Sequence, residues 1–213
     1  MTKMSRTQIF LIILIVMTFL LGTASIFFFR QHDSSGKQRD TFYIDTNFDV
    51  VRKIMVRNDC LEEIVSYQHG EVLDQKWEDL DITMVTLRKW DIDGVGRLVV
   101  KAEDPEAGAL ILPFEQTVHV RHDNIKSHTY LIDPVKYLKD YQTKVEMSRD
   151  GDRTKVVLEV SLKYGRKLPA SYVEYMDTKV QESADKGCAK AKEALIAVVA
   201  KYRDRKFTIP LRD

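Results

Sequence analysis

The chain has 213 residues, of which 33 are Lys or Arg and 32 are Asp or Glu, so its formal net charge is +1. This balance argues against nucleic acid as a partner, because binding to phosphates needs clustered positive charge. The two cysteines, Cys60 and Cys188, form neither a disulfide scaffold nor a metal-ligand pattern. We expect two buried free thiols, with a disulfide between them as the alternative in an oxidising compartment.

One apolar run dominates the N-terminal region. After a short basic stretch over residues 1–8, the run begins at Ile9 and ends at Phe29, without a formally charged side chain. About 20 apolar residues span a bilayer as a helix, so we expect a single-pass membrane anchor with the following domain on the extracytoplasmic side. The alternative is a signal peptide cleaved after residues 22–24, which would leave a secreted or periplasmic protein. Residues 26–29 continue the apolar run beyond that site and favour the anchor.

The next segments divide into a linker and a folded domain. Residues 30–40 are polar and contain the triplet Ser34-Ser35-Gly36, which is typical of a flexible linker. We expect the domain to cover residues 41–206 and to be followed by a short tail over 207–213.

The domain is predicted to open with one strand and two short helices. Residues 41–45 are rich in β-branched and aromatic side chains, which favours a strand. Asn47 is placed to cap a helix that begins at Phe48, and Asn58 or Asp59 is placed to cap a second one. Two short helices directly after one strand are an uncommon and therefore informative arrangement.

Strand patterns fill the middle of the chain. The predicted strands cover residues 71–77, 82–90, 97–103, 109–121, 125–132, 141–147 and 154–164. Asp93-Gly94 and Asp150-Gly151 are turn signals, and residues 133–140 are expected to form an insertion. Because these strands are linked by hairpins and alternate apolar with polar residues, we expect an antiparallel sheet with one wet face.

A long amphipathic helix is predicted over residues 171–202. Its apolar and small residues recur in steps of three and four, at Val173, Met176, Val180, Ala184, Gly187, Cys188, Ala191, Leu195, Val198 and Tyr202. At 1.5 Å per residue the helix would be about 45 Å long. A helix of that length with one apolar face needs a broad surface, which is most simply a curved sheet.

This order of elements resembles the START-like, or Bet v 1-like, helix-grip superfamily, also called SRPBCC or polyketide cyclase-like. The resemblance covers residues 41–202. It rests on TFYIDTNFDVVRKIMV and on RTKVVLEVSLKYG followed by the long helix. It implies an α+β fold in which a curved antiparallel sheet grips the C-terminal helix around a hydrophobic cavity. Members bind lipids, sterols, quinones, polyketides or other apolar ligands, and some are cyclases or hydrolases.

Small residues on the helix stripe fit such a cavity, although they would equally allow helix and sheet to touch and close it. Four polar residues on inward strand positions are candidates to orient a ligand, with ordinary sheet packing as the alternative. The candidate cavity residues are Gln116, Tyr141, Thr143, Tyr164, Ala184, Cys188, Ala191 and Leu195.

No catalytic motif is present, and we expect no metal, cofactor or catalytic residue. His119, His122 and His128 lie around one predicted hairpin, but their spacing matches no zinc site. Residues 91–94 resemble the start of a calcium loop without its later ligands. Trp77 is interpreted as a core residue, with contact to a membrane surface as the alternative.

We therefore expect a membrane-anchored START-like domain that binds a lipid or other apolar small molecule. The alternatives are an interaction adaptor whose grip is packed solid and a cyclase- or hydrolase-type enzyme. The adaptor would show no internal volume, whereas the enzyme would need an acid or base inside the cavity.

Overall fold

The computed structural model describes residues 29–56, 60–86, 89–104 and 108–204. The predicted anchor up to residue 28, the helix cap at Asn58 or Asp59 and the tail over 207–213 lie outside these residues. Among the described residues, no helix combines the length and apolar character needed to cross a bilayer.

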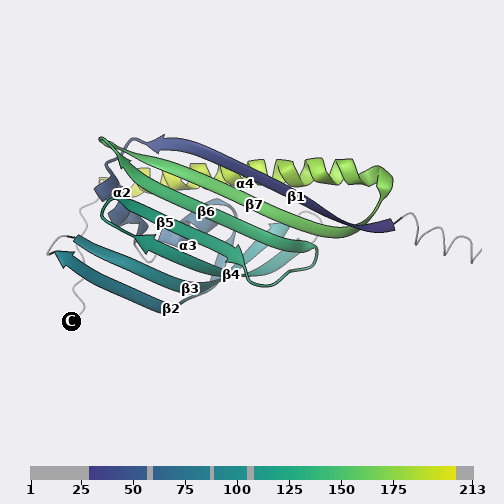
Figure 1. Cartoon of the computed structure of the whole chain (residues 1–213), viewed down its shortest axis with the longest axis horizontal. Coiled ribbons are helices and arrows are strands. Elements are labelled where there is room, and N and C mark those ends of the chain that lie inside the picture. Colours follow the sequence, from purple (N-terminus) through teal and green to yellow (C-terminus); the bar gives the residue numbers. More distant parts are fainter. Residues whose placement is uncertain (1–28, 57–59, 87–88, 105–107, 205–213) are drawn as a thin grey trace, which may run out of the picture.

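Seven antiparallel strands form one curved sheet in the order β1-β7-β6-β5-β4-β3-β2 (Figure 1). The strands are β1 (Phe29–Ile44), β2 (Glu71–Thr86), β3 (Lys89–Asp104), β4 (Gly108–Val120), β5 (Asn124–Leu131), β6 (Leu138–Asp150) and β7 (Arg153–Pro169). Two short helices, α2 (Phe48–Met55) and α3 (Cys60–Tyr67), connect β1 to β2. A 3-10 turn, η1 (Ala170–Tyr172), leads from β7 into the long helix α4 (Val173–Tyr202).

Several local predictions are confirmed. The Asn47 side chain accepts a hydrogen bond from the Asp49 backbone N–H at 2.9 Å, so α2 begins at Phe48 with its cap satisfied. Alternate residues of β7 from Thr154 to Leu162 are buried, as the period of two predicts. Gly151 has a φ of 59° in the β6–β7 turn, a conformation that glycine adopts without steric cost.

The prediction of a flexible linker over residues 30–40 is wrong, because these residues belong to β1 and pair with β7 from Arg30↔Leu168 to Asp40↔Leu158. Their small side chains serve a close contact. A Cβ atom on Gly36 would lie 2.4 Å from the backbone oxygen of Val180 in α4. The Gln181 amide also bonds both the N–H and the C=O of Lys37, at 3.1 and 2.9 Å. The Ser-Ser-Gly triplet therefore marks where the helix crosses the strand.

The predicted turn at Asp93-Gly94 is also wrong, because β3 continues through both residues from Lys89 to Asp104. The predicted strands over 71–77 and 82–90 accordingly form one long strand, β2, and the start of β3. Gly94 is small for a packing reason, since an added Cβ would lie 2.9 Å from the Trp77 ring. The predicted insertion over 133–140 is shorter than expected, because Leu138 already begins β6.

Helix α4 packs mainly on β1 and β7, at one side of the sheet (Figure 1). Its buried residues are Val180, Ala184, Cys188, Ala191, Ala194, Leu195, Val198, Val199 and Tyr202. All of these except Ala194 join two clusters of buried side chains, one around Phe48, Val156 and Leu158 and the other around Leu98, Phe114 and Leu162. Both cysteines are buried thiols that do not form a disulfide, as expected.

Candidate ligand-binding cavity

A cavity of about 360 Å³ lies between the sheet and its helices. Residues of α2 and α3 close one side, and Ala191 and Leu195 of α4 close another. Strands β2 to β7 form the wall opposite them. Because successive side chains of a strand point to opposite faces, each strand contributes alternate residues to this wall.

Most of the strand wall is apolar. Val118 and Val120 of β4, Ile125 of β5 and Val145 and Met147 of β6 line it. These side chains also belong to, or pack against, the larger buried cluster. The same alternation that builds the core therefore extends into the cavity, and the cavity interrupts the core rather than lying apart from it.

A row of neutral polar groups crosses the middle of this wall. Gln116 of β4 is in register with Thr129 of β5, and Thr129 is in register with Thr143 of β6. Ser127 lies one inward position further along β5, and its Oγ lies 3.3 Å from the Gln116 amide nitrogen, which donates to it. Amides and hydroxyls in such a row can both donate and accept hydrogen bonds without carrying charge.

Tyr141 adds a phenol beside this row. Its ring meets the Phe114 ring edge-on at 5.6 Å between centroids. Burial raises the pKa of the Tyr141 hydroxyl above its ordinary value, and a hydrogen bond with Thr143 offsets part of that rise. Tyr141 is therefore a neutral hydrogen-bonding group at physiological pH.

The β2 side of the cavity depends on a bulge. Trp77 is paired with Gly96 and Leu80 with Gly94, and the ladder shifts register between Trp77 and Asp79. The extra residue, Glu78, restores the alternation so that Trp77, Leu80 and Ile82 all line the cavity. The Trp77 ring occupies the space that a side chain at position 94 or 96 would need.

The eight residues predicted to line a cavity divide into two groups. Gln116, Tyr141, Thr143, Ala191 and Leu195 surround the cavity. Tyr164, Ala184 and Cys188 lie outside its lining.

Tyr164 packs beside Tyr137, with 5.4 Å between ring centroids, and against the cluster that contains Leu162. Ala184 is fully buried in that same cluster. Cys188 lies in the larger cluster, and burial raises the pKa of its thiol. The middle of α4 therefore packs against the core, while Ala191 and Leu195 nearer its C-terminal end face the cavity.

Sequence reasoning missed many lining residues, among them Trp77, Leu80, Ile82, Ser127 and Thr129. Ser127 and Thr129 share the inward period of β5 with Ile125, so the alternation contained that signal. The bulge in β2 breaks the period of two, so its inward residues had no comparable signal.

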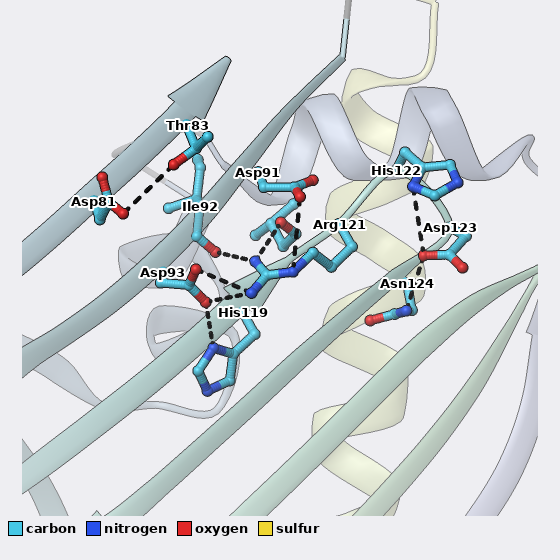
Figure 2. A network of polar contacts seen from close by, with 11 residues as sticks. Asp81, Thr83, Asp91, Ile92, Asp93, His119, Arg121, His122, Asp123 and Asn124 are labelled. Atoms are coloured by element: carbon cyan, nitrogen blue, oxygen red, sulfur yellow. Dashed lines mark hydrogen bonds and ion pairs between the residues drawn. The ribbon is translucent and has the colours of Figure 1, made fainter. Parts of the chain in front are cut away.

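The histidines do not converge on one site. Figure 2 shows Asp93 of β3 accepting hydrogen bonds from Arg121, at 2.7 and 2.9 Å, and lying 2.6 Å from His119 Nδ1. The Arg121 guanidinium, followed by His119, lowers the pKa of the Asp93 carboxyl.

The other two histidines lie elsewhere. His122 contacts Asp123 at 3.8 Å (Figure 2). His128 lies 3.3 Å from the Gln142 side-chain oxygen. Within the described parts of the chain, no three His, Cys, Asp or Glu residues are grouped to hold a metal ion.

No protein-family model matches the chain, and the search of curated proteins found no relative. Solved structures of similar form include a Staphylococcus aureus protein of unknown function, with 11% identity over 82% of this chain and 99% of that one and a TM-score of 0.48. Another is the Zhui aromatase/cyclase from Streptomyces sp. R1128, with 12% identity, 78% and 94% coverage and a TM-score of 0.45. A third is a START superfamily protein from Mycobacterium smegmatis, with 10% identity, 78% and 97% coverage and a TM-score of 0.43.

The strand order of the chain itself, its two short helices after β1 and its long final helix form the arrangement expected from the sequence. The chain therefore has a helix-grip fold, in which a curved antiparallel sheet packs against a long C-terminal helix.

Proposed function

We propose that this protein is a membrane-anchored binding module that takes up an uncharged, mostly apolar small molecule between its sheet and its helices. The observation that carries this proposal is the cavity of about 360 Å³, with apolar walls and a row of neutral hydrogen-bonding groups. Sites for small molecules commonly combine these features, since apolar walls supply affinity and a few polar groups fix orientation.

The size of the cavity limits the ligand. One water molecule takes up about 30 Å³ in the liquid, so the cavity holds roughly a dozen groups of that size. This volume suits a compact apolar molecule or one end of a longer chain. A lipid would therefore enter with part of its length. The remainder would extend out of the cavity past Leu80 and Ile82 of β2, which are half exposed.

The chemistry of the lining favours binding over acid–base catalysis. Within the described residues, Cys60 and Tyr141 are the titratable side chains of the lining, which includes no Asp, Glu, His, Lys or Arg. A charged ligand would be buried here without an opposite charge, which is costly. The cavity volume likewise favours a binding module over an adaptor whose grip is packed solid.

The proposed anchor is the apolar run from Ile9 to residue 28, in a single-pass topology with the domain on the extracytoplasmic side. The strand β1 begins at Phe29 and pairs with β7 from its first residue. In this proposal the run is therefore followed by the sheet itself, without a flexible spacer, and the start of β1 lies near the bilayer surface.

The test uses the full chain in lipid nanodiscs and the neutral fluorescent probe N-phenyl-1-naphthylamine, with empty nanodiscs as background. We expect Gln116→Leu combined with Thr143→Val to change probe affinity at least tenfold, because the polar row is replaced by apolar groups of similar size. The matched control is Gln142→Leu, since Gln142 bonds Asp140 and His128 outside the cavity lining. We expect the control to leave the affinity within a factor of two.

Mass spectrometry of organic extracts from the purified full chain then identifies any retained molecule. We expect a neutral compound that is depleted in the Gln116/Thr143 variant. Absence of retained molecules together with absence of probe binding above the empty nanodiscs would contradict the proposal.

A further inference from the structure

Strand β2 is an exposed edge of the sheet. It is the last strand in the order β1-β7-β6-β5-β4-β3-β2, so only its β3 side is hydrogen-bonded within the sheet. All ten side chains from Lys76 to Val85 are exposed. The other edge strand, β1, is different, because every second residue from His32 to Ile44 is at least partly buried and α4 packs on it. The outward N–H and C=O groups of β2 therefore form a template on which another strand can pair.

One stretch of this edge is regular. The ladder to β3 shifts register between Trp77 and Asp79 and again between Met84 and Thr86. Between these two bulges the pairing runs without interruption from Asp79 to Met84. Bulges protect an edge from further pairing, whereas the six residues between them are about as long as an average strand. Residues 79–84 are therefore the part of β2 that can accept one more strand.

The two faces of this stretch differ in chemistry, because successive side chains alternate between them. Leu80 and Ile82 line the cavity, and Met84 follows on the same face. These three side chains are 48%, 59% and 71% exposed. Asp79 and Asp81 lie on the opposite face of β2. A strand added beside residues 79–84 would therefore meet apolar groups on one face and carboxylates on the other.

The carboxylates of the regular stretch have no positive partner among the described residues. β2 carries five acidic residues and one lysine, and two of the acids, both outside the regular stretch, pair with cations of β3. Asp79 and Asp81 form no such ion pair within the described part of the chain. Asp81 is in register with a further carboxylate, Asp93, whose own partner is Arg121 (Figure 2). The edge is therefore acidic and attracts positive charge.

This charge decides between the possible occupants. A second copy paired through β2 would place two strands side by side that each carry five acids and one lysine, and like charges directly opposite each other are destabilising. A segment with lysine or arginine opposite Asp79 and Asp81 would gain attraction instead. Its alternate residues would lie beside Leu80, Ile82 and Met84, so they would have to be apolar.

We propose that residues 79–84 bind an extended segment of another protein, in which lysine or arginine alternates with apolar residues, as an eighth strand of the sheet. Backbone hydrogen bonds to the β2 edge supply affinity, and the two faces supply specificity. This docking goes beyond the proposed ligand binding and does not rest on it, because its groups are the edge and the exposed side chains of β2.

The test uses the full chain in nanodiscs of zwitterionic phosphatidylcholine, with empty nanodiscs as background. The probes are fluorescein-labelled peptides of alternating lysine and valine or of alternating glutamate and valine, and fluorescence anisotropy measures their affinities. We expect the basic peptide to bind at least tenfold more tightly than the acidic one. In Asp79→Lys combined with Asp81→Lys we expect the preference to reverse.

The matched control is Asp150→Lys combined with Asp152→Lys, which changes the charge equally in the exposed β6–β7 turn. Four strand spacings, or about 19 Å, separate β6 from β2, which exceeds the screening length of about 8 Å at physiological salt. We expect both affinities to stay within a factor of two. A preference that remains in the Asp79/Asp81 variant, or that reverses in the control as well, would overturn the proposed site.

Two N-methylated versions of the basic peptide separate strand pairing from simple charge attraction. Methyl groups on the valine amides block one edge of the extended peptide, and methyl groups on the lysine amides block the other. We expect one version to lose at least tenfold in affinity and the other less than threefold. Equal affinities of the two versions, or no binding of the basic peptide above the empty nanodiscs, would overturn the pairing. A disulfide between two chains in most molecules of Ile82→Cys would also overturn it and would assign the edge to a second copy.

Discussion

The two sides of one sheet differ in how completely they are covered. On β1 and β7, Phe42, Val156 and Val160 are buried under α4, and Gly36 lets the helix backbone approach closely. On β2, Leu80 and Ile82 face the cavity and remain half exposed. Seven strands spaced by about 4.8 Å are far wider than one helix of about 10 Å, so α4 covers one side of the sheet only. Close packing on the β1 and β7 side, the closed side, thus leaves room for a cavity on the β2 side, the open side.

Replacing Gly36 with valine should break the closed side and give the largest effect. The new Cβ would lie 2.4 Å from the Val180 oxygen and 2.8 Å from its carbonyl carbon, and backbone atoms of a helix cannot move aside cheaply. We expect a loss of about 3 kcal/mol in the free energy of unfolding, as for severe overpacking. Urea titration followed by circular dichroism measures it.

The neighbouring Ser35→Val is the matched control, because Ser35 is exposed on the other face of β1. We expect its effect to stay within about 0.5 kcal/mol, as is usual at the surface. Similar stabilities for the two variants would mean that residues 30–40 behave as a linker after all, and the closed side would lose its explanation.

Replacing Gly94 with alanine should alter the open side while leaving the closed side intact. The added methyl group would lie 2.9 Å from the Trp77 ring and 3.2 Å from Leu80 Cδ1, so the ring must shift and Leu80 must give by a few tenths of an ångström. Both side chains line the cavity, so its shape changes. We expect about a tenfold loss of affinity for N-phenyl-1-naphthylamine, or about 1.4 kcal/mol, with a smaller change in stability.

A second substitution, Trp77→Leu, should restore most of that affinity in the Gly94→Ala background, because it removes the ring that the methyl group displaces. An additive loss in the double variant would contradict this account and would mean that Gly94 acts on the cavity by another route.

The sequence predicted the elements whose one face is buried and whose period is regular. β7 and α4 are examples, because burial of one face produces periods of two and of 3.6. Residues 30–40 could not be recognised as a strand, since the close approach of α4 selects Ser and Gly at the crossing, and these residues are equally typical of linkers. Gly94 was misread for a similar reason, because space for the Trp77 ring and a tight turn both favour glycine.

The cavity was predictable to the same degree as the strands that form it. Gln116, Tyr141 and Thr143 occupy inward positions of strands with a regular period, and all three line the cavity. Trp77, Leu80 and Ile82 lie on either side of a bulge, so no single alternation places them on one face. Along α4, sequence alone could not separate Ala184 from Ala191, because the choice depends on where the curved sheet leaves the helix.

Replacing Gly187 with alanine should strengthen the closed side and so sharpen the contrast. Its added Cβ would meet only Val160 Cγ1, at 3.6 Å, which is an ordinary van der Waals contact. Because alanine is the better helix former, we expect a gain of up to about 1 kcal/mol in the free energy of unfolding and no change in probe affinity. A loss of stability would show that α4 tolerates no added group opposite Val160 either, in addition to its crossing with Gly36 of β1.

Lowering the pH should loosen the closed side slightly through Asp40 of β1, which accepts a hydrogen bond from Lys192 of α4 at 2.9 Å. This bond lowers the pKa of the Asp40 carboxyl below its ordinary value, although partial burial opposes the shift. The stabilisation is therefore present above the unfolded pKa of about 4 and is lost as the pH falls through the lower folded pKa. Since the two side chains are 36% and 37% exposed, solvent screening limits it to about 0.2–1 kcal/mol. Unfolding at pH 7 and pH 3 should differ less in Asp40→Asn than in the unmutated chain; an identical pH dependence would show that the Asp40–Lys192 contact does not help to hold α4 on β1.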